Sequence, residues 1–125
     1  MPSRVIHDDQ MPAALGPYSQ AVAAFGELVF ISGQAGLDSA GAIPEGFDAQ
    51  ARNAFDNLAR VVEAAGLSMA DVVKTTIYLA DASQFPALNA LYAEYFSTKP
   101  PTRAVPIVQL PKGLLISIEA VAVRP

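Results

Sequence analysis

The chain has 125 residues, enough for one hydrophobic core but too few for two, and we predict a single domain over residues 1–125. Its formal net charge is −4 and its eight lysines and arginines are scattered, which argues against a nucleic-acid-binding protein. Cysteine is absent, which excludes disulfides, thiolate metal sites and cysteine nucleophiles, and the single histidine cannot build a multi-histidine metal centre.

The first third of the chain predicts short strands. Residues 4–7 form a possible edge strand, and the polar residues 8–16 form a loop. Residues 20–24 and 28–32 are predicted to pair as a hairpin around Phe25-Gly26-Glu27. The N-terminus contains no apolar stretch typical of a secretory signal, and no apolar run is long enough for a transmembrane helix, so we expect a cytoplasmic protein without a membrane partner.

Two positions in this region are candidates for a ligand site. Tyr18 follows the Gly16-Pro17 turn signal, where its hydroxyl either faces a pocket or packs at the entrance of a strand. Ser32 and Gly33 end the second predicted strand. They offer a hydroxyl and a backbone amide that a ligand can approach closely, unless the glycine serves only a turn or a bulge.

The middle of the chain predicts two helices around one strand. Apolar residues recur at helical spacing over residues 47–65, and Gly66 is placed to end that helix. Residues 72–79 form a strand, and residues 83–96 form the second helix, with a proline in its first turn. Asn89 lies near the start of this helix and by itself indicates no more than a solvated side chain.

The segment from Pro100 to Val123 predicts two further strands joined by a turn at Pro111-Lys112-Gly113. Alternation places Ser117 and Glu119 on one face of the last strand, which is apolar on both faces. We therefore expect the helices to cover one face of the sheet and a second copy of the chain to cover the other. Glu119 needs either a structural partner or a catalytic task, because burying an unpaired charge is costly.

The predicted order is β-β-α-β-α-β-β, an α/β (α+β) arrangement. Its polar residues near strand ends and helix starts fit a pocket for a small anionic organic molecule, in which the guanidinium of Arg103 would bind a carboxylate. No phosphate-binding loop, zinc spacing or nucleophile elbow was found, so we expect no metal and no cofactor. From the residues alone, the chemistry of this pocket stays open.

Several motifs, in this order along the chain, resemble the RidA/YjgF family: GPYSQAV, ISGQ, EAAG, DVVKTTIYL, LNALYAEYF, PTR and IEAVAV. The resemblance covers almost the whole chain. It implies a chorismate-mutase-like subunit, a homotrimer and ligand clefts between subunits. It also implies cofactor-free hydrolysis of reactive enamines and imines, such as 2-aminoacrylate, to 2-keto acids and ammonia.

The resemblance assigns roles to individual residues. Arg103 matches the carboxylate-binding arginine; the other matching positions of the pocket are Tyr18, Ser32, Gly33 and Asn89. Val105 stands where a cysteine is common, which is a small change if only the backbone carbonyl is used.

The sequence departs from the family at the acid that positions the attacking water, where Ser117 stands, whereas Glu119 matches the second acid of the pair. A serine can orient water but cannot accept its proton near neutral pH. Two functions therefore remain open, an imine or enamine deaminase with an altered water-activating site and a binder of small carboxylates. A nuclease or translation inhibitor has little support in an acidic chain without histidine pairs.

Overall fold

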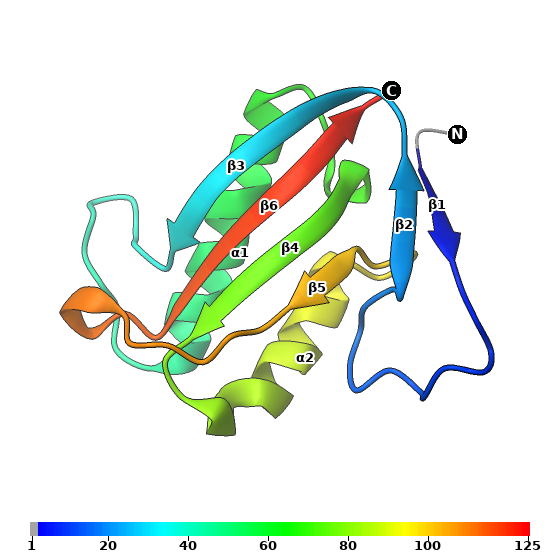
Figure 1. Ribbon diagram of the computed structural model, residues 1–125. Helices are drawn as coiled ribbons and strands as arrows, with labels where there is room; N and C mark the ends of the chain where they lie inside the picture. The colour runs from blue at the N-terminus through cyan, green and yellow to red at the C-terminus, as the bar shows by residue number, and fades with distance from the viewer. Residues whose placement is uncertain (1–2) are drawn as a thin grey trace.

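The computed structural model describes residues 3–125, and its centre is a mixed four-stranded sheet with two helices on one face (Figure 1). The strand order is β3-β6-β4-β5. The strands are β3 (Glu27–Ala35), β4 (Val72–Leu79), β5 (Thr102–Ala104) and β6 (Ile116–Arg124). β6 runs antiparallel to both of its neighbours, and β4 and β5 are parallel. The predicted α+β fold is confirmed.

The central strand β6 shows how the sheet divides into a covered and an uncovered face. Ile116, Ile118 and Ala120 are buried beneath the helices, whereas the alternating Ser117 and Glu119 are only partly buried. Period-two alternation therefore places the apolar set against the helices. The helix-free face is the one that the sequence predicted would need cover from a second copy.

The helices α1 (Phe47–Ala64) and α2 (Phe85–Tyr95) pack behind the sheet and supply the core. Both agree with the predicted ranges to within a few residues. α1 stops where Gly66 adopts a φ of 77°, a left-handed angle that glycine tolerates without strain. Phe55 of α1 packs edge-on against Tyr92 of α2 and stacks on Tyr95, which joins the two helices over the sheet.

Three 3₁₀ turns connect these elements: η1 (Met69–Asp71), η2 (Ala82–Gln84) and η3 (Pro111–Gly113). η1 begins with a capping box between Ser68 and Asp71. η3 is the predicted turn before the last strand, and Lys112 and Gly113 both have positive φ there.

The predicted pairing of the N-terminal strands is wrong. β2 (Ala21–Ala24) pairs with β1 (Ser3–Ile6) in a separate two-stranded ribbon, and it forms no ladder with β3. The ribbon stands apart from the four-stranded sheet, at the right of the view in Figure 1. The turn at Phe25-Gly26 exists, but it directs the two strands away from each other.

The last two strands also do not form a hairpin. The last strand lies where it was predicted, but the strand before it covers only Thr102–Ala104 and does not continue to the turn at Pro111. β4 lies between β5 and β6, so Thr102–Ala104 pairs with β4 rather than with β6. The segment from Val105 to Leu115 crosses the end of the sheet, where the Val108 amide donates to the carbonyl of Leu79. None of the helices in residues 3–125 combines the length and apolarity that crossing a bilayer requires.

Candidate functional site

The candidate residues form two clusters. The first, here called the arginine cluster, lies where β5 meets α2 and the loop before β2, and it comprises Tyr18, Phe85, Asn89, Tyr92 and Arg103. The second, here called the strand-face cluster, lies on the helix-free face of β3, β4 and β6, and it comprises Ser32, Gly33, Tyr78, Ser117 and Glu119.

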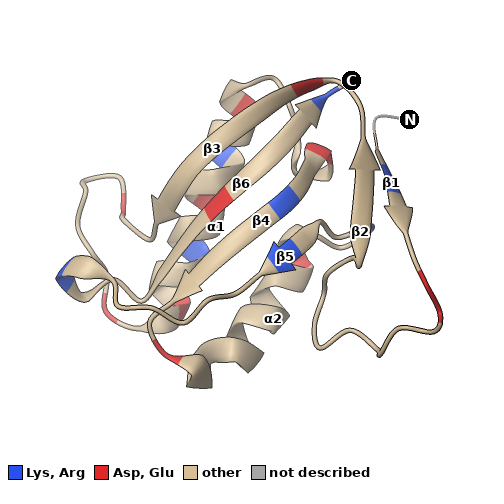
Figure 2. Cartoon of the chain, viewed as in Figure 1, with Lys and Arg blue, Asp and Glu red and all other residues tan. Residues whose placement is uncertain are grey.

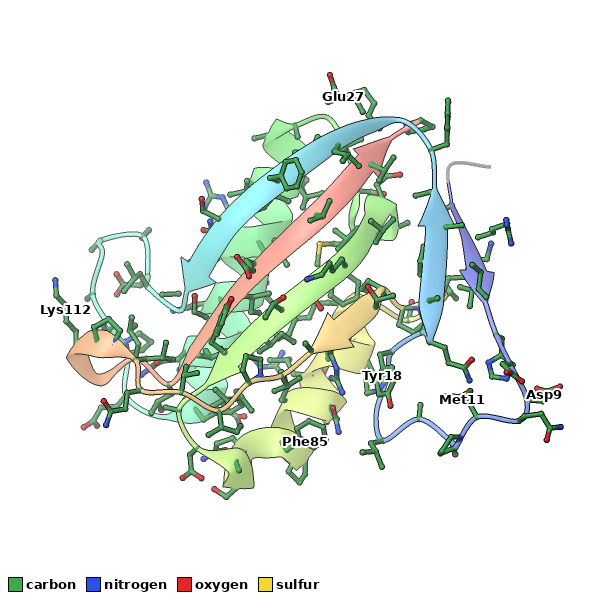
Figure 3. All side chains as sticks on the ribbon, viewed as in Figure 1. Asp9, Met11, Tyr18, Glu27, Phe85 and Lys112 are labelled. Carbon is green, nitrogen blue, oxygen red and sulfur yellow. The ribbon has the colours of Figure 1, made fainter. Side chains whose placement is uncertain are left out.

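Arg103 is the centre of the arginine cluster. Its Nη1 donates a 2.9 Å hydrogen bond to Oδ1 of Asn89, and its Cζ lies 4.9–5.5 Å from the ring centroids of Tyr18, Phe85 and Tyr92. Phe85 and Tyr18 approach this point from α2 and from the loop (Figure 3). Burial lowers the pKa of the guanidinium from its ordinary value, and it forms no ion pair with any residue of the described chain. A half-buried cation without an anion is suited to binding one.

The loop that carries Tyr18 is fixed against β5. The Ser19 amide donates to the carbonyl of Pro101 over 3.2 Å, and the Ser19 hydroxyl donates to the carbonyl of Pro100. A Cβ at Gly16 would lie 2.5 Å from Nη2 of Arg103 and 2.8 Å from Oδ1 of Asn89. A side chain at position 16 would therefore displace the guanidinium or the Asn89 amide from the places that they now occupy beside the loop.

Tyr92 forms the floor of this cluster. Its hydroxyl and the Thr75 hydroxyl are 2.8 Å apart in a hydrogen bond, and both side chains are completely buried. Burial raises the pKa of Tyr92 to about 12, so the ring beneath Arg103 is neutral at any physiological pH.

Glu119 is the centre of the strand-face cluster. Its Oε1 accepts a 2.7 Å hydrogen bond from the Tyr78 hydroxyl, which raises the pKa of that tyrosine. Among the described residues Glu119 forms no ion pair and accepts no hydrogen bond from a backbone amide, so Tyr78 is its structural partner. Figure 2 shows that the central strands carry few charges, and Glu119 and Lys74 are the charged residues in the middle of β6 and β4.

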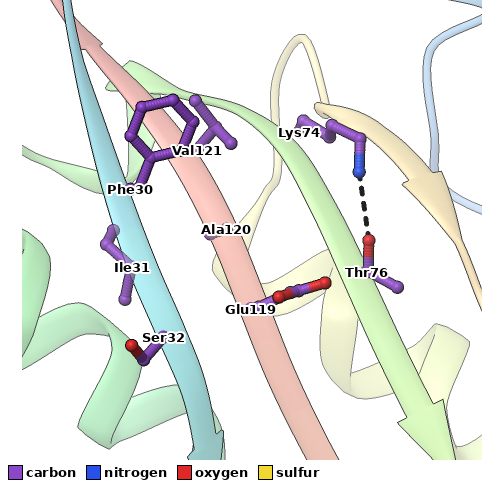
Figure 4. Close-up of a pocket in the computed structure, with 8 residues that line it drawn as sticks. All are labelled: Phe30, Ile31, Ser32, Lys74, Thr76, Glu119, Ala120 and Val121. Atoms are coloured by element: carbon purple, nitrogen blue, oxygen red, sulfur yellow. Dashed lines mark hydrogen bonds between the residues drawn. The ribbon is translucent and has the colours of Figure 1, made fainter.

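Glu119 borders a shallow hollow of about 290 Å³ on the sheet face (Figure 4). Lys74 donates to the Thr76 hydroxyl at its rim, 3.1 Å away. The hollow is lined by Phe30, Ile31, Ser32, Lys74, Thr76, Glu119, Ala120 and Val121. Polar and apolar side chains both contribute to this lining.

Ser117 sits one pair further along the same face. It lies opposite Tyr78 in the β4–β6 ladder, next to the Thr76–Glu119 pair. A Cβ at Gly33 would lie 2.8 Å from the Ser117 hydroxyl oxygen, so the predicted Ser32-Gly33 pair does come close to Ser117. The side chain of Val105 belongs to neither cluster, because it packs against the hydrophobic core.

The two clusters face opposite sides of the sheet. Arg103 pairs in register with Thr75, whose side chain is buried beneath α2, whereas Glu119 pairs with Thr76 on the helix-free face. Because neighbouring residues of a strand point to opposite faces, one small molecule cannot touch both side chains within one chain. The structure thus brings the predicted residues together in two groups rather than one.

Four members of these clusters were not predicted as site residues from the sequence: Gly16, Tyr78, Phe85 and Tyr92. Tyr78 stands two residues after Thr76, so a shared face was visible in the sequence, but its contact with Glu119 depends on the β4–β6 register. In the described residues no three histidine, cysteine, aspartate or glutamate side chains gather as a metal site.

This architecture defines an α+β subunit with an uncovered sheet face and polar clusters at the sheet edge and on that face. The family model described as Endoribonuclease L-PSP matches residues 8–124. The chain therefore belongs to the RidA/YjgF family, as its motifs predicted.

Individual relatives match over nearly the full length of both chains. A Salmonella typhimurium protein named 2-iminobutanoate/2-iminopropanoate deaminase is 42% identical, and the match covers 98% of each chain. The crystal structure of RidA from an Antarctic Psychrobacter is 42% identical with a TM-score of 0.76, covering 97% of this chain and 99% of that one. A Yersinia pestis protein of unknown function, the Rid protein YyfB, is 30% identical with a TM-score of 0.89, covering 99% of this chain and all of that one.

Proposed function

We propose that this protein hydrolyses 2-imino acids and their enamine tautomers to 2-keto acids and ammonia, in clefts between the subunits of a homotrimer. The observation that carries the proposal is Arg103, a half-buried guanidinium enclosed by aromatic rings and lacking an anion of its own. The relative from Salmonella typhimurium bears the name of a 2-imino acid deaminase, and such substrates carry a carboxylate next to the reacting carbon.

Arg103 would bind that carboxylate. Asn89 uses one donor of the guanidinium, which leaves the other N–H groups for a bidentate contact with the substrate. The rings of Tyr18, Phe85 and Tyr92 exclude water from this contact and strengthen it. Charge-assisted hydrogen bonds of this kind are worth roughly 1.5–3 kcal/mol each.

The second half of the site would come from another subunit. The arginine cluster and the strand-face cluster point away from each other within one chain, and the strand face also exposes Leu28 and Phe30. Placing the strand face of one subunit against the β5 edge of the next covers these side chains and brings both clusters around one substrate. Closed symmetric oligomers are the common outcome of such contacts, and a ring of three is the form that the family implies.

The chemistry needs a water molecule and a proton acceptor. Water adds to C2 of the protonated imine and its proton passes to a base, which gives a carbinolamine. The base returns this proton to the amino group, which leaves as ammonia while the carbinolamine hydroxyl loses its proton, so that the keto acid and one ammonium ion form. Glu119 is the carboxylate available on the strand face, Ser117 would orient the water, and Tyr78 would hold Glu119 in place. Enamine substrates enter after tautomerisation, which moves a proton from nitrogen to carbon and needs no cofactor.

Ser117 also supports a second candidate, a binder of small carboxylates without turnover. Freshly generated 2-aminoacrylate separates the two functions. A deaminase accelerates ammonia release above the spontaneous rate, in proportion to protein concentration. A binder leaves that rate unchanged, while 2-ketobutyrate still raises the melting temperature of the wild type and not that of Arg103→Ala.

A further inference from the structure

The outer edge of β3 has no partner strand. β3 pairs with β6 on one side, and nothing in residues 3–125 pairs with its other side. Its regular part, Glu27–Ile31, contains one charge and no proline, and Leu28 and Phe30 are 55% and 74% exposed. Proteins normally blunt such an edge with charges, proline or a covering segment, because a bare apolar edge is a template for another strand.

A second bare edge belongs to β2. This strand, Ala21–Ala24, carries no charge and pairs only with β1. Figure 1 shows the β1–β2 ribbon projecting beside the sheet rather than lying on it. A two-stranded ribbon is marginal in water by itself, so it gains stability from any further strand that it joins.

The local sequence favours pairing of these two edges with each other. β2 and β3 are joined by Phe25 and Gly26 alone, and a two-residue connection is the commonest hairpin loop. In the structure the connection is instead bent away. Gly26 has a φ of 141°, and a Cβ there would lie 2.1 Å from the Arg124 carbonyl oxygen, so the bend is packed against the end of β6.

The start of the ribbon is held at the far side of the sheet from the free edge of β3. Ser19, two residues before β2, is bonded to Pro100 and Pro101 at the entry to β5. β5 and β3 are the two opposite edges of the sheet. β2 therefore cannot lie along its own β3 while these bonds are intact.

We propose that the β1–β2 ribbon is exchanged between subunits, so that β2 of one copy pairs antiparallel with the free edge of β3 in a second copy. The exchange pairs the free backbone groups of both edges. It also brings together the same side-chain pairs that a hairpin of β2 and β3 within one chain would form. Swapping an identical element is a low-cost route to an oligomer. This assembly contact is separate from the proposed reaction, and its test needs no activity.

The test uses disulfides, because the chain contains no cysteine of its own. With Phe25 and Gly26 as the whole connection, Ala23 stands opposite Leu28 in the exchanged pair, and Ala21 stands opposite Phe30. The double variant Ala23→Cys/Leu28→Cys is oxidised and run on a non-reducing gel. Ala21→Cys/Phe30→Cys repeats the test at a second pair, and Arg4→Cys/Ala23→Cys is the matched control, because these residues pair within the ribbon.

Exchange predicts covalent multiples of the 13.1 kDa chain for both test pairs, and an unlinked chain for the control, whose disulfide is internal. Mixing differently tagged chains during expression should then give mixed covalent products. Two results would overturn the proposal. An internal disulfide in the test variants would mean that β2 pairs with its own β3. Free thiols in the test variants, when the control is oxidised, would mean that β2 does not occupy the edge of β3.

Discussion

The Tyr78 hydroxyl donates a 2.7 Å hydrogen bond to Oε1 of Glu119 on the neighbouring strand. Tyr78 is itself paired in register with Ser117, so the hydrogen bond runs diagonally across the face on which water would be activated. It occupies one oxygen of the carboxylate and leaves the other as an acceptor. In the proposed mechanism, Tyr78 therefore sets the direction of the base.

Tyr78→Phe should lower kcat for 2-aminoacrylate by about tenfold, because a hydrogen bond to a charged group is worth roughly 1.5–3 kcal/mol. KM should change little, since Tyr78 does not belong to the arginine cluster. Steady-state kinetics measure both constants.

Tyr95→Phe is the matched control for this substitution. It removes a tyrosine hydroxyl that also bonds to a carboxylate, that of Asp56, on the helix side of the molecule. Equal losses of kcat in the two variants would mean that the Tyr78 effect is only structural.

The geometry of the arginine cluster can be altered without removing its charge. Gly16→Ala places a methyl group 2.5 Å from Nη2 of Arg103 and 2.8 Å from Oδ1 of Asn89, so both side chains have to move. We expect it to weaken 2-keto-acid binding by at least about tenfold, because the guanidinium loses its bidentate geometry. Arg103→Lys should weaken binding similarly, since an ammonium cannot make a forked contact. Calorimetric titration measures both variants, and wild-type affinity in either would exclude this cluster from carboxylate binding.

A carboxylate at position 117 should increase turnover. Ser117→Glu places a base where the family implies one, and positioned acid–base groups contribute about 10²–10⁴-fold in rate. Ser117 is only partly buried on the helix-free face, so a longer side chain can extend away from the sheet. Ser117→Gln is the control of equal shape, and it should not raise the rate. A gain in both variants would show that shape rather than charge is responsible.

The buried hydroxyl of Tyr92 predicts a loss of stability in alkali. Its pKa rises from 10.0 in the unfolded chain to about 12 in the folded protein. Between these two pKa values the hydroxyl is ionised in the unfolded chain but not in the folded protein, so raising the pH favours unfolding. Once the pH exceeds both values, the free energy of unfolding has fallen by about 2–3 kcal/mol.

Tyr92→Phe isolates this contribution. At pH 8 it should cost roughly 1 kcal/mol through the lost hydrogen bond to Thr75. Near pH 11.5 it should be at least as stable as the wild type. Urea unfolding at the two pH values measures the free energy of unfolding of the variant and of the wild type. The same difference between the two proteins at both pH values would contradict the assigned pKa.

Sequence periodicity predicted most of the fold but not how the strands pair. Both helices and β4 follow from local spacing and from Gly66, because their burial repeats at 3.6 or 2 residues. The Phe25-Gly26 connection carries the same local signal whether the hairpin is closed or open. In the open form Ser19 is bonded to Pro100 and Pro101, which lie more than 80 positions away, so no local pattern encodes this contact.

The sequence predicted several members of the two clusters, but it predicted neither the division into two clusters nor the aromatic residues around Arg103 other than Tyr18. Motif resemblance identified Arg103, Asn89 and Tyr18, which the structure brings together around the guanidinium. That Glu119 faces the other side depends on the register of β4 with both β5 and β6, which no local pattern encodes. The same register supplies Tyr78 as the partner of Glu119.

The central claim is that one active site is built from two subunits, and mixed oligomers test it most directly. Arg103→Ala and Glu119→Gln should each be almost inactive alone, because each lacks one half of every site. Co-expressed with different tags and purified as mixed trimers, they should recover about a third of the wild-type rate, because every mixed ring has one complete cleft among its three. Mixed trimers as inactive as the two parent variants would place both halves in one chain and contradict the account.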